Sequence, residues 1–153
     1  MADVGLIWQD GWADILLNES NSDLQTGKDL KTAILVSLFS DSRANPEELL
    51  LDEDPRGWWS RDLGSLLWLL ARQKTTLQNL EKGIQYIKDA LNWLIVQNIA
   101  KSIDVTGTIE NRSKFNFIIT IKKSNDYRFQ YLWENINADS YKFDRSEYLI
   151  LFQ

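Results

Sequence analysis

The sequence predicts an α+β fold, in which helices pack on a small antiparallel sheet. Apolar residues recur at spacings of three and four along residues 76–99, and this is the period of one helix face. After Lys101 the period changes to two, as in strands that bury one face. The chain has 153 residues, of which 44% are hydrophobic, so we expect a single domain over residues 1–153.

The expected sheet has three strands, at about residues 103–110, 114–122 and 127–133. β-branched or aromatic residues alternate with polar ones in each strand, most clearly in "FNFIITI" from Phe115. The intervening "NRS" and "SND" are typical of hairpin turns. The pattern therefore predicts a three-stranded antiparallel meander with one apolar face.

Three helices are expected before this sheet. The first spans residues 28–40, where four apolar residues share one stripe. Residues 41–60 contain both prolines of the chain and are predicted to form a loop. A short helix is expected at about residues 61–72, although Gly64 weakens its helix propensity. The long helix at about 76–99 follows a capping signal, in which Thr75 precedes a glutamine by three residues.

The long helix carries a seam of leucine and isoleucine at heptad-like spacing, formed by Leu77, Leu80, Ile84, Ile87, Leu91 and Leu94. The seam covers about two and a half heptads, too few to specify a coiled coil. Two interpretations stay open. The seam packs on the protein's own sheet, or it is shared with a helix of a partner.

Both ends of the chain contain short apolar segments. Residues 1–27 are interpreted as short strands joined by a turn at residues 18–22. Residues 135–153 are a candidate extended or strand-exchanging tail that finishes on an apolar run. This run either forms the final strand of the protein's own sheet or is offered to another molecule. The interface candidates within it are Tyr148, Ile150 and Phe152.

Composition excludes several classes of function. The chain has neither cysteine nor histidine, so it lacks thiolate chemistry, the commonest general base and the usual zinc ligands. We expect no metal and no cofactor. The net charge of −5 argues against a nucleic-acid partner, which would require a basic face. No apolar run approaches the roughly 20 residues of a membrane span, so no membrane partner is expected.

The most distinctive motif is "DPRGWW" at residues 54–59. Trp58 and Trp59 are adjacent and therefore point in different directions, so one can be buried while the other serves as an interface anchor. Arg56, before Gly57, either binds a carboxylate or carbonyl within this turn or forms an ordinary surface ion pair. All four residues are interface candidates.

The five carboxylates of residues 47–54 next to these tryptophans leave two other functions open. A glycoside hydrolase needs only a pair of carboxylates and aromatic walls. A carboxylate in a solvated cluster, however, lacks the apolar pocket that an acid catalyst requires. The second alternative is a glycan-binding module that uses Trp58 and Trp59 as its platform.

Five segments together resemble a known family. They are "AILVSLFSDSRA" (33–44), the acidic loop, "DPRGWW" (54–59), "GSLLWLLARQKTT" (64–76) and "ALNWLI" (90–95). Their order and spacing resemble the small baseplate wedge protein of Mu-like contractile-tailed phages and prophages. That group is similar to the wider sheath-initiator family, whose T-even member is often labelled lysozyme-like. The resemblance covers roughly residues 12–134.

Two departures from the family pattern stand out. The family usually continues after the two tryptophans with glycine and an acidic residue, where this chain has Ser60 and Arg61. The wider family also has a Glu-Pro-Arg motif after the long helix, at its contact with the wedge core. The matching region here reads "IVQNIAKS", without proline or arginine.

The resemblance implies a structural role in a contractile tail and no enzymatic activity. It implies a sheath-initiator-like domain that docks on larger baseplate wedge proteins and nucleates polymerisation of the tail sheath subunit. The sheath would add strands to an edge of the sheet at residues 103–133, with residues 147–152 as a candidate further strand. Tube or hub proteins are further candidate partners. The resemblance also implies several copies in each baseplate of the virion, assembled in the host bacterial cytoplasm.

Overall fold

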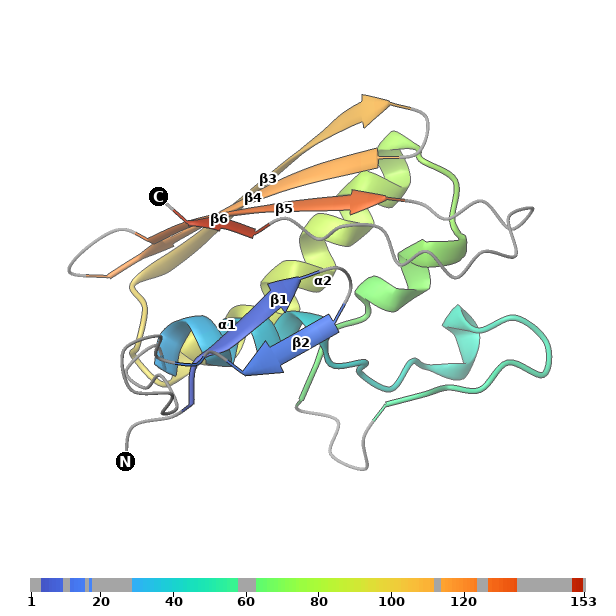
Figure 1. Cartoon of the computed structure of the whole chain (residues 1–153). Helices are drawn as coiled ribbons and strands as arrows, with labels where there is room; N and C mark the ends of the chain where they lie inside the picture. Colours follow the sequence, from blue (N-terminus) through green and yellow to red (C-terminus); the bar gives the residue numbers. More distant parts are fainter. Residues whose placement is uncertain are drawn as a thin grey trace.

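The computed structural model describes residues 4–9, 12–15, 17, 29–57, 63–111, 114–123, 127–134 and 150–152. It confirms the α+β fold. The elements are β1 (Leu6–Gln9), β2 (Trp12–Ile15), α1 (Asp29–Phe39), the 3-10 helices η1 (Pro46–Glu48) and η2 (Leu67–Arg72), α2 (Leu77–Val96), β3 (Ser102–Asn111), β4 (Lys114–Lys122), β5 (Tyr127–Glu134) and β6 (Ile150–Phe152). The sheet of β3–β6 forms one layer, and α2 runs along its lower side in Figure 1.

The expected meander is confirmed. The strands lie in the order β3-β4-β5-β6, and each neighbouring pair is antiparallel. The central strand β4 shows why the period of two was so clear, because alternate side chains are completely buried: Phe115, Phe117, Ile119 and Ile121. Full burial of such a side chain stabilises the fold by about 1.5–3 kcal/mol. This row is the centre of the hydrophobic core.

The seam of α2 packs on the protein's own sheet. Four of its members are buried in the same core as the β4 row: Leu80, Ile87, Leu91 and Leu94. Ile84 is partly buried against them. The expectation that Leu77 belongs to the seam is wrong. Leu77 is the first residue of α2 and its side chain is 71% exposed.

Two glycines bring α2 close to the sheet. A Cβ atom on Gly83 of α2 would lie 2.7 Å from the Phe117 Cζ atom of β4. A Cβ atom on Gly107 of β3 would lie 2.8 Å from the Leu80 Cδ1 atom. Both distances are shorter than carbon atoms tolerate, so a larger residue at either position would force a neighbouring side chain to shift.

The cap of α2 is one residue later than expected. The Thr76 Oγ1 atom accepts a hydrogen bond from the Asn79 backbone N–H at 3.2 Å, so Thr76 is the N-cap. The Asn79 side chain donates to the Lys74 carbonyl oxygen at 2.7 Å and thereby fixes the chain before the helix. The predicted cap, Thr75, has a buried hydroxyl without a hydrogen-bond partner in the described part of the chain.

The expected helix at residues 28–40 is confirmed as α1, whereas the helix at residues 61–72 is not. Only Leu67–Arg72 are helical there, and they form the 3-10 helix η2. Gly64 has a left-handed φ of 99°, and Ser65 pairs with Asp41 in a strand-like bridge. Neither conformation is helical, so the helix begins only at Leu67. Residues 61 and 62 lie outside the described residues.

The N-terminal strands are present, but the expected turn does not join them. β1 and β2 form an antiparallel ribbon in which Gln9 pairs with Trp12, so the connection falls at residues 10–11. The predicted turn at residues 18–22 lies outside the described residues. The Thr32 hydroxyl of α1 bonds to both the Val4 carbonyl oxygen and the Leu6 N–H, and this ties the ribbon to the helix.

At the C-terminus, Ile150–Phe152 form β6, which pairs with β5 within the protein's own sheet. This backbone pairing agrees with the first of the two interpretations of the tail, in which it forms the final strand of the protein's own sheet. Tyr148 lies outside the described residues. None of the helices within the described ranges has the length and apolar character needed to cross a membrane.

Candidate interface site: the Arg56 junction and its loop

Two segments far apart in sequence are joined after α1. Asp41 and Ser65 form an isolated parallel bridge. The Ser42 N–H donates to the Ser65 carbonyl oxygen, and the Ser65 N–H donates to the Ser40 carbonyl oxygen, each at 2.9 Å. The Ser65 hydroxyl is buried and donates to the Leu38 carbonyl oxygen at 2.6 Å. The strand-like contact therefore connects the segment after α1 to the segment just before η2.

Arg56 completes this junction. Its guanidinium carbon lies 4.6 Å from the centre of the Trp68 ring, and its Nη1 atom lies 3.3 Å from the Asp41 Oδ2 atom. The Trp68 Nε1–H donates to the Ser42 carbonyl oxygen at 2.9 Å. The Arg56 and Asp41 side chains are 53% and 43% exposed, so the ion pair alone adds little stability. We call Asp41, Ser42, Arg56, Ser65 and Trp68 the Arg56 junction.

The backbone at Arg56 and Gly57 adopts an unusual conformation. Arg56 has a φ of 50° and Gly57 a φ of 78°, both in the left-handed region. The Arg56 N–H donates to the Asp54 Oδ1 atom at 2.9 Å, which stabilises this turn. A Cβ atom at Gly57 would lie 2.3 Å from the Arg43 backbone nitrogen, so only glycine fits. The need for glycine at position 57 is thus explained by packing within the chain.

The junction carries a loop, residues 45–55, whose ends are closed by a bond from the Ala44 N–H to the Pro55 carbonyl oxygen at 3.0 Å. At its start, the Asn45 N–H donates to the Glu48 Oε2 atom at 3.1 Å in a capping box around η1. Farther along, the Leu50 N–H donates to the Glu53 Oε2 atom at 2.9 Å. Loop 45–55 is therefore held by its own hydrogen bonds.

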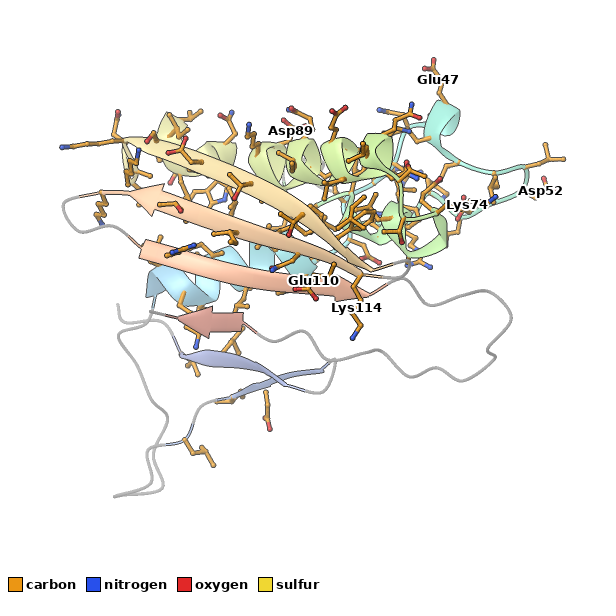
Figure 2. The ribbon with its side chains drawn as sticks, turned by 90° about the horizontal axis from the view of Figure 1, so that it is seen from above. Glu47, Asp52, Lys74, Asp89, Glu110 and Lys114 are labelled. Atoms are coloured by element: carbon orange, nitrogen blue, oxygen red, sulfur yellow. The ribbon has the colours of Figure 1, made fainter. Side chains whose placement is uncertain are left out.

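The carboxylates of this loop differ in role. Glu48, Glu53 and Asp54 each accept a backbone N–H bond within the loop or its adjoining turn. Glu47 and Asp52 point away from the body of the protein (Figure 2). Glu47, Asp52 and Asp54 are exposed. Exposed carboxylates are not in the apolar surroundings that an acid catalyst requires. Among the described residues, no group of acidic side chains could hold a metal ion.

The interface candidates that the structure describes lie in two separate places. Arg56 and Gly57 lie at the junction, and Trp58 and Trp59 lie outside the described residues. Ile150 and Phe152 belong to β6, which Figures 1 and 2 place away from loop 45–55. Asp41 and Trp68 were not predicted from the sequence as partners of Arg56. No periodic signal links them, because they converge only through tertiary contacts.

The comparisons with known proteins agree with the resemblance found in the sequence. The model of the family described as "Phage protein GP46" matches residues 30–127. The chain is 38% identical over 112 residues to "Baseplate protein gp46" of Escherichia phage Mu, covering 69% of this chain and 76% of that protein. It is 34% identical over 114 residues to "Mu-like prophage FluMu protein gp46" of Haemophilus influenzae, covering 71% of this chain and 77% of that protein. No solved structure matches the chain. The chain belongs to the phage GP46 family.

Proposed function

We propose that this protein is a structural component of a contractile-tail baseplate, which docks on larger wedge proteins and nucleates sheath polymerisation by strand addition. Membership of the GP46 family and the name of the phage Mu relative, a baseplate protein, support the baseplate role. In this role the protein acts by assembly, in several copies within the tail of the virion, after synthesis in the host cytoplasm. Tube or hub proteins are further neighbours in such an assembly.

The observation that carries strand addition is the outer edge of β3. This strand has ten residues and lies at one end of the sheet order, paired with β4. Among the described strands, none pairs with its other edge. Figure 1 shows β3 running the length of the sheet at this border. An open edge offers a row of backbone donors and acceptors to an extended segment of another protein.

Both faces of β3 are compatible with the addition of a strand from a partner protein to its open edge. On the outer face, Thr106 and Thr108 are exposed, and Asp104 forms an ion pair with Lys122 of β4 at 3.0 Å. On the core face, Val105 is buried, but Ile109 farther along the strand remains 36% exposed. Ile109 pairs with the completely buried Phe115, so an added strand would extend the apolar face over it.

A pair of neighbouring substitutions tests this proposal. Ile109→Lys places a charge on the core face of the edge strand, where an added strand would have to bury it. Thr108→Lys gives the same residue type on the outer face and serves as the matched control. We expect Ile109→Lys to slow or abolish sheath polymerisation by purified sheath subunits on assembled baseplates, while Thr108→Lys leaves it unchanged.

Thermal unfolding of both variants separates this effect from loss of folding. Normal sheath polymerisation by a folded Ile109→Lys protein would contradict strand addition at β3. The baseplate role itself has a separate test, which is stable recovery of the large wedge protein with the wild-type chain after co-expression. Failure of that recovery would contradict docking on the wedge.

A further inference from the structure

We infer that the tip of loop 45–55 is a docking knob, in which Leu50 and Leu51 enter an apolar pocket bordered by lysine or arginine on another baseplate protein. This inference rests on the proposed baseplate function and identifies the surface through which the protein docks. It is carried by the exposure of two adjacent leucines, by the fixed backbone that presents them, and by the charge around them.

The two leucines are unusually exposed for apolar residues at adjacent positions. Leu51 is 95% exposed and Leu50 is 65% exposed. Single exposed leucines are common on protein surfaces and need no explanation. Here, however, both lie in the turn at the outer end of a protruding loop, where small polar residues, glycine and proline are the usual choice. Figure 2 places their neighbour Asp52 at this outer end.

The backbone of the tip is fixed rather than free to fold the leucines inward. The Glu53 N–H donates to the Leu50 carbonyl oxygen at 3.1 Å, which closes a four-residue turn. Asp52 occupies the third position with a φ of 62°, as in a type II turn. The Glu53 carboxylate accepts the Leu50 N–H from the same turn. A tip ordered before binding loses less conformational entropy when it docks, which favours affinity.

The charge of the loop defines its partner. Residues 47–54 contain five carboxylates and no lysine or arginine. Glu47 precedes and Asp52 follows the leucines in the sequence, and both acidic side chains point outward (Figure 2). A partner pocket must therefore place basic groups at its border. The chain itself has a net charge of −5, which disfavours a second copy as the partner. An anionic lipid or nucleic-acid surface would likewise repel this loop.

The test measures binding of the full-length chain to the purified large wedge protein of the same tail. The first variant is Leu50→Ser/Leu51→Ser, and its control is Leu77→Ser, which removes another strongly exposed leucine at the start of α2. We expect the double variant to bind at least about tenfold more weakly, with an unchanged unfolding temperature. The control should bind like the wild type.

A second variant tests the charge. Glu47→Gln/Asp52→Asn removes two outward charges, and asparagine tolerates the left-handed backbone at position 52. We expect slower association at low salt and a smaller difference from wild type at high salt. Wild-type affinity in the leucine variant would overturn the inference while leaving the baseplate function intact. Absence of binding by the wild-type chain would contradict docking on the wedge, and the inference would fail with it.

Discussion

The Arg56 guanidinium lies over the Trp68 ring, with 4.6 Å between its central carbon and the ring centre. The same indole donates its N–H to the Ser42 carbonyl oxygen. Trp68 thus contacts two segments. Its indole N–H binds Ser42 in the segment after α1, and the face of its ring contacts Arg56 just after loop 45–55. Arg56 therefore makes two contacts within the chain, at the point where loop 45–55 returns to the body of the protein.

The first prediction concerns the planar geometry of this contact. Arg56→Lys keeps the charge but loses the flat group that stacks on Trp68 and reaches Asp41. We expect the free energy of unfolding to fall by at most about 0.5–1 kcal/mol, the usual size of an exposed cation–π contact, because lysine keeps part of the charge attraction. Denaturant titration measures this change. The control is Arg43→Lys at a nearby exposed position, and an equal effect in both variants would show that stacking is unimportant.

The second prediction concerns Gly57. Gly57→Ala places a methyl group against the Arg43 backbone, which cannot move aside as a flexible side chain can. We expect the free energy of unfolding to fall by about 1–3 kcal/mol, together with faster proteolysis within loop 45–55. Glu47→Ala in the same loop is the control and should change little. Wild-type stability and protease resistance of Gly57→Ala would show that the left-handed turn is dispensable.

The third prediction distinguishes two adjacent threonines. Thr76→Ala removes the N-cap of α2 and should lower the free energy of unfolding by about 0.5–2 kcal/mol. Thr75→Val keeps the shape of its side chain and removes a buried hydroxyl that has no partner in the described residues, so it should be neutral or stabilising. Thermal unfolding of both variants checks the order. The reverse order would restore Thr75 as the cap.

The fourth prediction concerns Gly83, where helix propensity and packing have opposite effects on the stability of an alanine variant. Alanine normally stabilises a helix interior relative to glycine by about 0.5–1 kcal/mol. At Gly83 the added methyl group would meet the ring of Phe117, whose side chain is completely buried. We therefore expect Gly83→Ala to be destabilising by about 1–3 kcal/mol in denaturant titration. A gain in stability would mean that α2 can move away from the sheet at little cost.

The α+β fold was predictable where burial follows a regular period. In β4, four alternate side chains are completely buried, so the period of two is uninterrupted. In α2, the buried residues repeat at helical spacing, and only Leu77 at its first turn departs from the seam. Periodicity works in these elements because each contacts one continuous core.

The Arg56 junction was not predictable in the same way. Arg56 meets Asp41 and Trp68 through a turn with left-handed backbone, and neither contact leaves a periodic trace in the sequence. The helix expected at residues 61–72 failed for a related reason. Its leucines suit a helix, but the pairing of Ser65 with Asp41 requires an extended chain at that point.

The sequence pattern also failed to locate two small features, the N-cap of α2 and the connection between β1 and β2. Thr75 and Thr76 are equally good caps by residue type. In the structure Thr76 is the N-cap, and the Asn79 side chain also donates a hydrogen bond to the Lys74 carbonyl oxygen. The connection of β1 to β2 was overlooked although Asp10-Gly11 is a strong two-residue hairpin signal. The register of Gln9 with Trp12 is what locates it.

The closure of loop 45–55 at its base makes the tip a replaceable unit. Because Ala44 and Pro55 are joined by a backbone bond, the residues between them can be lengthened, shortened or exchanged without altering how the chain enters and leaves the core. A peptide or tag inserted between Leu51 and Asp52 would therefore leave the core intact but would interrupt the docking tip.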